Sequence, residues 1–172
     1  MLEVRFATED DIETLVRLRR DFNDEWHPHT EVVQARFTAQ FRQLLDRGLG
    51  TGKFVAALGF VGPELASGAF LVINDYPADC EIPHGRLATL IDVYTYPQYR
   101  RHGYGRQVVA AMIVKARDMG VDTIDLLATK AGEGVYGQVG FKVCENIPMR
   151  LVLTTTSPLS PANESFNATT AS

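Results

Sequence analysis

The sequence predicts an α/β (α+β) fold, a mixed sheet flanked by helices, and three observations support this prediction. Residues 86–109 begin as an apolar strand, pass through a polar loop rich in arginine and glycine, and continue as an amphipathic helix. Residues 123–129 form a second apolar run after that helix, and a right-handed crossover makes two such strands parallel. Two further apolar runs, 53–58 and 66–74, are separated by Gly and Pro and indicate an antiparallel hairpin.

The sequence pattern of the N-terminal residues predicts one strand followed by a helix. Residues 3–7 alternate between polar and apolar side chains, which is typical of a strand. Thr8 and Asp11 then stand at the spacing of a capping box, with acidic residues in the first helical turn. Apolar residues at helical spacing indicate that this helix ends near residues 21–23.

Residues 22–30 contain the one tryptophan of the chain, two histidines and a proline. We expect a loop here that either lines a substrate site or covers the core. His27 and His29 flank Pro28, so they lack the i, i+4 spacing of a helical metal-binding pair and argue against a metal site. Apolar residues at helical spacing over 31–47 predict a second helix.

The second half predicts one long helix and the remaining strands. Residues 74–85 hold two prolines and several acidic or amide side chains, and we expect an irregular loop that leads into a strand at 86–95. The helix that begins at Tyr104 ends at Gly120, a typical C-cap. The last strands are predicted over residues 123–129, 141–144 and 149–154, with a short helix or turn at 132–138.

Length and composition favour a single domain. With 172 residues, of which 45% are hydrophobic, the chain is long enough to bury one core. We expect a domain over residues 2–154 and a flexible tail over 155–172, where Ser, Thr, Pro, Ala and Asn predominate. No apolar signal core and no apolar run near ~20 residues is present, which predicts a cytoplasmic protein without a membrane span.

The charge and cysteine patterns exclude several classes of binding partner and site. The net charge of -4 argues against non-specific binding to nucleic acid or to an anionic membrane. Cys80 and Cys144 belong to no CxxC or Cys/His cluster, so neither a disulfide framework nor a zinc site is supported. Against this acidic background, Arg100, Arg101 and Arg106 form a local positive patch.

Two glycines within this patch predict a phosphate site. Gly103 and Gly105 stand where a strand passes into a helix, so unpaired N–H groups and the helix dipole point at one small volume. A glycine admits positive φ and lets an anion approach the main chain closely. The stretch is not a nucleotide-triphosphate P-loop, because GxxxxGKS/T is absent. It is not a dinucleotide fingerprint either, because Val108 stands where a third glycine is required.

These motifs together resemble the GNAT superfamily of acyl-CoA-dependent N-acetyltransferases over about residues 2–154. The family motif Q/R-x-x-G-x-G/A is matched by RRHGYG, residues 100–105, after a strand that ends in VYTYP. A later Y-x-x-x-G-F motif is matched by YGQVGF, residues 136–141, and the opening VRFATEDD is similar to the family's first strand and helix start. The resemblance implies a mostly antiparallel sheet with one parallel, splayed pair of strands.

The resemblance also implies acetyl-CoA as cosubstrate and no metal. The coenzyme would lie between the splayed strands, and the main chain of Val93, Tyr94 and Thr95 would pair with its pantetheine arm. Backbone amides of the following loop would hold the pyrophosphate, and Tyr136 would lie beside the thioester sulfur. The implied loop residues are Arg100, Arg101, His102, Gly103, Tyr104, Gly105 and Arg106.

Direct attack of an amine on a thioester requires a base for the amine and a proton for the departing thiolate. Tyr136 is the candidate acid, because a phenol with a pKa of about 10 can protonate a thiolate whose acid has a pKa of roughly 8.5. A tyrosine that only packs on the coenzyme is the alternative. Thr89 occupies the position where family members often have a glutamate, so the base is open between Asp92, Glu81 and a chain of waters. Asp92 fits a structural carboxylate equally well.

The sequence leaves the acceptor open. Glu25, Trp26, Tyr76 and Glu81 offer charge and cation–π contacts to a small cationic amine, which favours a small-molecule N-acetyltransferase. A protein or peptide amine is an alternative acceptor. A non-catalytic acyl-CoA-binding sensor or interaction module is the rival class, and the presence of Tyr136 favours the enzyme. A homodimer is left open.

Overall fold

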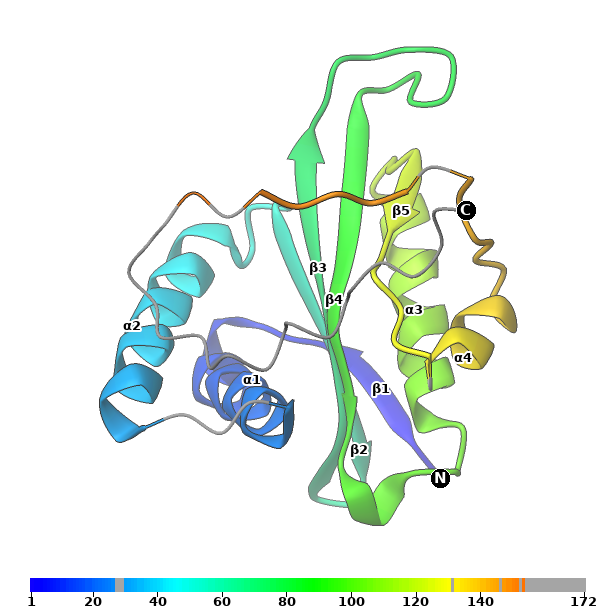
Figure 1. The fold of residues 1–172 in the computed structure, drawn as a ribbon. Helices are drawn as coiled ribbons and strands as arrows, with labels where there is room; N and C mark the ends of the chain where they lie inside the picture. The colour runs from blue at the N-terminus through cyan, green and yellow to red at the C-terminus, as the bar shows by residue number, and fades with distance from the viewer. Residues whose placement is uncertain (27–29, 131, 146, 152, 154–172) are drawn as a thin grey trace, which may run out of the picture. The chain divides into compact units, whose positions relative to one another are not determined.

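The computed structural model describes residues 1–26, 30–130, 132–145, 147–151 and 153 (Figure 1). Two short 3-10 turns, Glu9–Asp11 and Pro97–Tyr99, precede helices. In chain order the strands and helices are β1 (Glu3–Phe6), α1 (Ile12–Trp26), α2 (Glu31–Gly48), β2 (Phe54–Val61), β3 (Glu64–Asp75), β4 (Arg86–Thr95), α3 (Tyr104–Asp118), β5 (Thr123–Asp125) and α4 (Glu133–Gly137).

The described strands form one sheet in the order β1-β2-β3-β4-β5. β1 to β4 pair antiparallel with their neighbours, whereas β4 and β5 are parallel. The parallel pairing involves only Leu87, Ala88 and Thr89 of β4, and beyond them the two strands part (Figure 1). The predicted mixed sheet with one parallel, splayed pair is confirmed.

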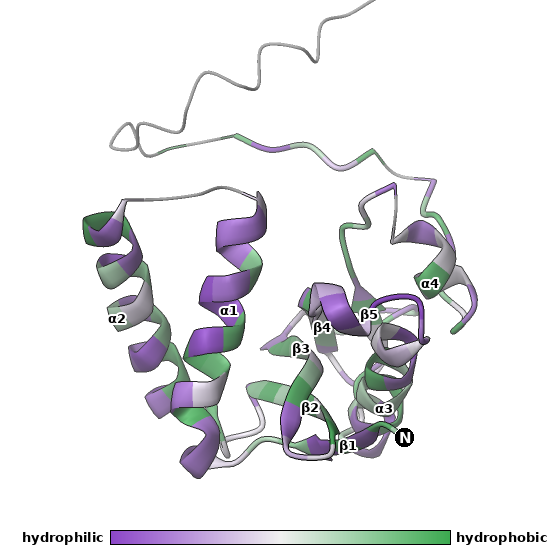
Figure 2. Ribbon diagram, turned by 90° about the horizontal axis from the view of Figure 1, so that it is seen from below, coloured by the Kyte–Doolittle hydropathy of each residue, from purple (hydrophilic) through white to green (hydrophobic). Residues whose placement is uncertain are grey.

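Helices cover both faces of the sheet, α1 and α2 on one face and α3 on the other (Figure 1). Each helix is amphipathic, with hydrophobic positions along one side (Figure 2). The largest fully buried side chains on the first face are Leu15, Leu18, Leu45, Leu58 and Phe70. α3 buries Val108, Val109, Met112 and Ala116 on the second face. The two layers therefore cover β4, which lies between β3 and β5, on both of its faces.

Most of the predicted elements are confirmed, some with shifted ends. β4 spans the predicted residues, and α3 begins at Tyr104 as expected. α1 continues beyond the predicted end near residues 21–23, so Glu25 and Trp26 lie on a helix and not in a loop. His27 and His29 lie outside the described residues.

Two predicted strands are wrong as far as the chain is described. Residues 141–144 form no strand, nor do 149–151 and 153, and the run predicted over 123–129 shortens to β5. Val143 is 85% exposed, so the alternation around Phe141 does not bury one face against a neighbouring strand. An apolar alternation predicts a strand only where a partner edge is available to pair with it.

The chain divides into two units, residues 1–142 and 143–172. Every helix and strand named above belongs to the first unit. In the second unit the described residues form neither helix nor strand. Its exposed apolar side chains are Val143, Ile147, Met149, Leu151 and Leu153. The predicted tail, 155–172, lies outside the described residues.

Asp11 ties β1 to the start of α1. Its carboxylate accepts two hydrogen bonds from the guanidinium of Arg5, at 2.6 and 2.7 Å, and one from the backbone N–H of Thr8 at 2.9 Å. The Asp11 side chain is only 10% exposed. The bonds from Arg5, aided by the one from Thr8, outweigh burial and lower the pKa of Asp11 to about 2. This cluster confirms the predicted role of Thr8 and Asp11 in beginning the helix.

We therefore expect Asp11→Asn to lower the free energy of unfolding by about 1–2 kcal/mol at pH 7. The folded protein holds the pKa of Asp11 below its unfolded value, so this stabilisation is present above pH ~4 and disappears as the pH falls through ~2. Urea unfolding of both proteins between pH 2 and 7 measures the difference. Glu9→Gln, on the same turn, is the control and should leave stability almost unchanged; a difference for Asp11→Asn that persists at pH 2 would contradict the ion-pair explanation.

Candidate functional site

The loop between β4 and α3 presents main-chain N–H groups that lack acceptors. It follows the 3-10 turn at Pro97–Tyr99 and ends where α3 begins. The N–H groups of residues 101–106 have no hydrogen-bond acceptor in the part of the chain that the structure describes. N–H groups at a helix start also carry the positive end of the helix dipole. The loop is therefore suited to bind an anion through its backbone.

Two residues with left-handed backbone give this loop its shape. Arg101 has a φ of 64° and Gly103, the N-cap of α3, has a φ of 74°. Gly105 serves a different purpose, because a Cβ there would lie 3.2 Å from Oγ1 of Thr95. Gly103 permits the left-handed turn of the backbone, and Gly105 permits the close approach of α3 to the end of β4.

The arginine side chains of the loop have different partners. Nη2 of Arg100 donates to both carboxylate oxygens of Glu25, at 2.7 and 2.6 Å. Nη1 of Arg106 donates to the amide oxygen of Gln138 at 3.0 Å. Arg101 is exposed. The charge of Arg100 is thus largely neutralised by Glu25, whereas Arg101 and Arg106 keep their positive charge beside the N–H groups of the loop.

Aromatic contacts order the loop without using its N–H groups. The ring of His102 stacks on Tyr104 with centroids 5.4 Å apart, and Tyr104 in turn lies 6.4 Å from Tyr99. Nδ1 of His102 lies 2.8 Å from the carbonyl oxygen of Arg100. The backbone N–H groups consequently need no rearrangement before they meet an anion.

The C-terminal half of β4 is supported on one edge only. β3 pairs with it as far as Thr95, whereas the pairing with β5 stops at Thr89. The buried hydroxyl of Ser67 donates to the carbonyl oxygen of Tyr94 at 2.8 Å and lies 2.9 Å from Oγ1 of Thr95. The main chain of residues 93–95 is thereby fixed on the β3 side, and no described strand pairs with its other edge.

A β-bulge in β4 changes the direction of Asp92. Between Ile91 and Tyr94, β4 has two residues where β3 has one, and Asp92 has a φ of 49°. In an unbroken strand Asp92 would share the face of Leu90, which packs toward α3. The bulge instead brings the Asp92 carboxylate to α1 on the opposite face.

Arg19 of α1 forms an ion pair with Asp92, whose side chain is 13% exposed. Burial raises the pKa of Asp92 above its ordinary value, and the Arg19 cation offsets only part of this effect. The Arg19 guanidinium also lies 4.9 Å from the ring centroid of Phe41 in α2. Sequence reasoning missed Arg19, because the bulge that brings Asp92 to it leaves no local pattern in the chain.

Tyr136 lies in α4 and is half-buried. Its ring packs edge-on against Phe141 with centroids 5.9 Å apart, and burial raises the pKa of its phenol. A phenol is already protonated at neutral pH at its ordinary pKa of about 10, so the hydroxyl has a proton to donate, although the raised pKa makes it a weaker acid. The bond between Arg106 and Gln138 links the end of α4 to the first turn of α3.

The four predicted acceptor-binding residues do not lie together. Glu25 and Trp26 end α1, and Glu25 accepts a hydrogen bond from the hydroxyl of Tyr94 at 2.9 Å in addition to its ion pair. Tyr76 and Glu81 belong to the loop at the opposite end of β4, roughly 30 Å away along the strand. One small amine cannot contact all four side chains.

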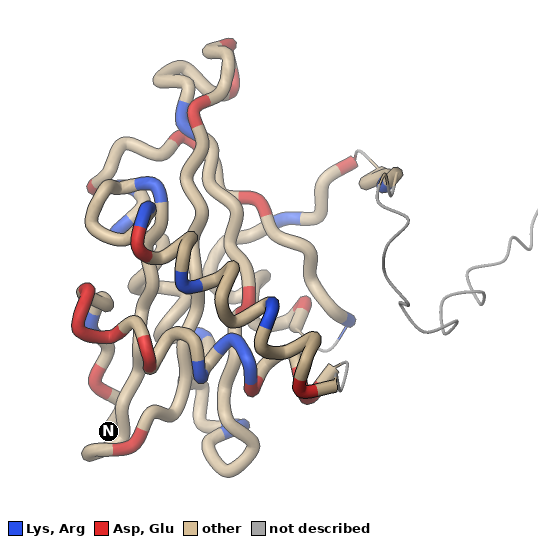
Figure 3. The backbone as a smooth tube through the Cα atoms, turned by 90° about the vertical axis from the view of Figure 1, so that its left-hand side faces the viewer, with Lys and Arg blue, Asp and Glu red and all other residues tan. Residues whose placement is uncertain are grey.

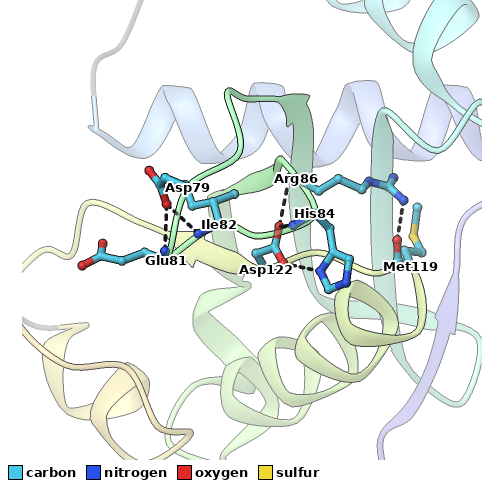
Figure 4. Close-up of polar contacts among 7 residues, drawn as sticks. All are labelled: Asp79, Glu81, Ile82, His84, Arg86, Met119 and Asp122. Carbon is cyan, nitrogen blue, oxygen red and sulfur yellow. Dashed lines mark hydrogen bonds and ion pairs between the residues drawn. The ribbon is translucent and has the colours of Figure 1, made fainter.

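The loop between β3 and β4 is anchored by Asp122, in the turn before β5 (Figure 4). Oδ2 of Asp122 accepts the backbone N–H groups of His84 and Arg86, at 3.0 and 3.1 Å, and Oδ1 lies 2.6 Å from Nδ1 of His84. Asp79 accepts the N–H of Glu81 at 2.8 Å. The Glu81 carboxylate points away from the His84 cluster (Figure 4), at the end of β4 remote from the bulge.

Among the described residues, no group of three or more His, Cys, Asp or Glu side chains is arranged to hold a metal ion. None of the described helices is both long and apolar enough to cross a membrane.

Comparisons with known proteins agree with this geometry. The model of the acetyltransferase (GNAT) family matches residues 13–141. The chain is 29% identical over 124 residues to glucosamine 6-phosphate N-acetyltransferase 1 of Oryza sativa subsp. japonica, covering 72% of each chain.

Solved structures show the same fold. A predicted acetyltransferase with acetyl-CoA from Clostridium acetobutylicum has a TM-score of 0.76 and 22% identity, covering 89% of this chain and 97% of that one. A GCN5-related N-acetyltransferase from Ralstonia eutropha JMP134 has a TM-score of 0.74 and 20% identity, covering 88% of this chain and 99% of that one. The chain therefore belongs to the GNAT family of acetyltransferases and is an acyltransferase of the EC 2.3.1 class.

Proposed function

We propose that this protein transfers an acetyl group from acetyl-CoA to the amine of a small molecule by direct attack. The observation that carries the proposal is the run of N–H groups at residues 101–106 without acceptors, at the start of α3. A diphosphate is the anion whose size and charge suit such a run of amides. Residues 93–95, unpaired toward β5, offer a strand edge on which an extended amide-containing arm could form hydrogen bonds.

Acetyl-CoA supplies the acetyl group as an activated thioester. The loop of residues 100–106 would hold its diphosphate, and the main chain of Val93, Tyr94 and Thr95 would orient the pantetheine arm. Tyr136 would donate the proton that the departing thiolate needs. Asp92 would accept the amine proton, directly or through water, because its raised pKa makes it a stronger base than an exposed carboxylate.

The small-molecule assignment has two supports. The relative from Oryza sativa is named for an amino-sugar phosphate acceptor. The chain also has two hollows between α1 and α2. The larger is lined mostly by charged and hydroxyl-bearing residues, and a smaller, more apolar one beside it reaches Arg19, the partner of Asp92. The two alternative functions are acetylation of a protein amine and binding of acyl-CoA without catalysis. The following experiment distinguishes both of them from the proposed function.

Release of CoA thiol in the presence of amino sugars, aminoglycosides, polyamines, amino acids and peptides tests the proposed function. We expect turnover with at least one small amine. Tyr136→Phe should lower kcat by about 100-fold or more, because general acid catalysis is lost, while the Kd for acetyl-CoA changes little.

Equal losses in kcat and in acetyl-CoA affinity would reduce Tyr136 to a packing residue. Binding of acetyl-CoA without turnover on any amine would instead favour the sensor. Turnover restricted to peptides would favour a protein acceptor.

Acetyl-CoA should raise the Tm of the wild-type protein, and Gly103→Val should abolish that rise. A β-branched residue does not tolerate the φ of 74° and would distort the N–H groups around it. Gly120→Val is the matched control, because Gly120 has a φ of 69° at the other end of α3. Both variants should lose intrinsic stability, but only the control should keep the ligand-induced rise. A full rise in Gly103→Val would contradict the loop assignment.

The pH dependence of kcat/KM tests Asp92 as the base. Arg19 favours the charged carboxylate, so Arg19→Gln should raise the pKa of Asp92 and move the acid limb of the profile to higher pH. Arg19→Lys keeps a cation and should leave the limb near its wild-type position. Asp92→Asn should remove the limb. An acid limb that is unaltered in Asp92→Asn would assign the base to water or to another group.

A further inference from the structure

The groove between α1 and α2 is framed by two side-chain bridges. At one end, Nε and Nη2 of Arg42 donate to the carboxylate of Glu13, at 2.9 and 2.6 Å. At the other end, Nε2 of Gln34 donates to Oδ1 of Asp24 at 2.6 Å. These bridges join the two helices and leave a surface hollow of about 360 Å³ next to the first of them. That volume is in the ~300–1,000 Å³ range of small-molecule sites.

The side chains that line this hollow are predominantly cationic. Arg17, Arg20 and Arg42 line it with a single carboxylate, that of Glu13, and the hydroxyls of Thr14 and Thr38 complete it. A net positive hollow is notable on a chain whose formal charge is -4. Figure 3 shows the charged positions on this side of the molecule.

Two of these arginines have hydrogen-bonding capacity to spare. Within the described residues Arg17 forms no hydrogen bond or ion pair. Arg20 donates from Nε and Nη2 to Oδ1 of its sequence neighbour Asp21, at long distances of 3.4 and 3.2 Å, and its Nη1 has no described partner. Two guanidinium groups one helical turn apart, beside the Thr38 hydroxyl, provide the planar, charged donors that a tetrahedral oxyanion accepts.

The hollow continues toward the proposed catalytic residues. A second hollow between the same helices shares Val16, Arg20 and Thr38 with the first and is also lined by Arg19. Arg19 is the residue that contacts Asp92 at the bulge. This second hollow encloses only about 20 Å³, so Arg20 and Arg19 mark the direction from the first hollow toward Asp92 and not a channel that a ligand fills.

We propose that this groove binds a phosphate or sulfate group of the acceptor, so that the substrate is an amine that also carries an oxyanion. This inference rests on the proposed function and names its substrate class. It differs from the expectation drawn from the sequence, in which acidic side chains grip a purely cationic amine. The structure separates those acidic residues and places arginines in the groove.

Glucosamine and glucosamine 6-phosphate form a matched pair of acceptors, because they differ only in the phosphate ester. We expect kcat/KM to be higher for the phosphate ester. In the double variant Arg17→Gln, Arg20→Gln, the ratio of the two kcat/KM values should fall about 10- to 100-fold, which corresponds to the loss of charged hydrogen bonds. Arg36→Gln, an exposed arginine of α2 that lines neither hollow, should keep the wild-type ratio.

A binding measurement separates the groove from the reaction. Inorganic phosphate, at constant ionic strength with chloride as the reference, should raise the Tm of the wild-type protein and of Arg36→Gln but not of the double variant. An unchanged kcat/KM ratio in the double variant would overturn the acceptor assignment, even if inorganic phosphate binds. Absence of acetyl transfer to every amine would remove the proposed function, whereas loss of the phosphate-induced rise in the double variant would still support the groove.

Discussion

The partial pairing of β4 is the constraint on which the rest of the site depends. β3 holds one edge of this strand through Thr95, whereas β5 holds the other edge only at Leu87, Ala88 and Thr89. Because β5 leaves so early, no described strand pairs with the edge of residues 93–95 that faces away from β3. The N–H groups of residues 101–106, where α3 begins, also have no acceptor among the described residues. These donors lie in exposed or half-exposed residues at a helix start, so they are free to meet water or an anionic ligand.

Side-chain charge is distributed so that α1 is fixed to β4 at two points. Arg19 contacts Asp92 at the bulge, and Glu25 binds both Arg100 and the hydroxyl of Tyr94 further along. Burial, with Glu25 beside it, raises the pKa of Tyr94 to about 12. These pairs neutralise Arg19 and Arg100, so the proposed phosphate binding would depend on the loop, with Arg101 and Arg106, and on Arg17 and Arg20 of α1.

Local sequence signals predicted the parts of the fold that are decided locally. The apolar run of β4, the glycines before α3 and the capping residues Thr8 and Asp11 all act within a few positions, and the structure confirms them. The bulge at Asp92 depends on the register with β3, which no local pattern encodes. The strand predicted at 141–144 is absent, and its Val143 is 85% exposed, so an apolar alternation alone does not determine a strand.

The acceptor residues illustrate a further limit of reading a chain in one dimension. Glu25 and Glu81 are equally plausible cation ligands in the sequence, yet opposite ends of β4 separate them. In the sequence, the arginines of α1 are typical of a solvent-exposed helix face. Only the structure shows that α2 lies beside them and that the two helices form a hollow.

Burial acts on the two proposed catalytic groups in opposite ways. It raises the pKa of Asp92, which strengthens that carboxylate as a base, and it raises the pKa of Tyr136, which makes the phenol a weaker proton donor. The same burial has a cost for Asp92, because a carboxylate with too high a pKa would be protonated at neutral pH. Arg19 limits that rise, so the ion pair across the bulge sets how much of Asp92 is available as a base.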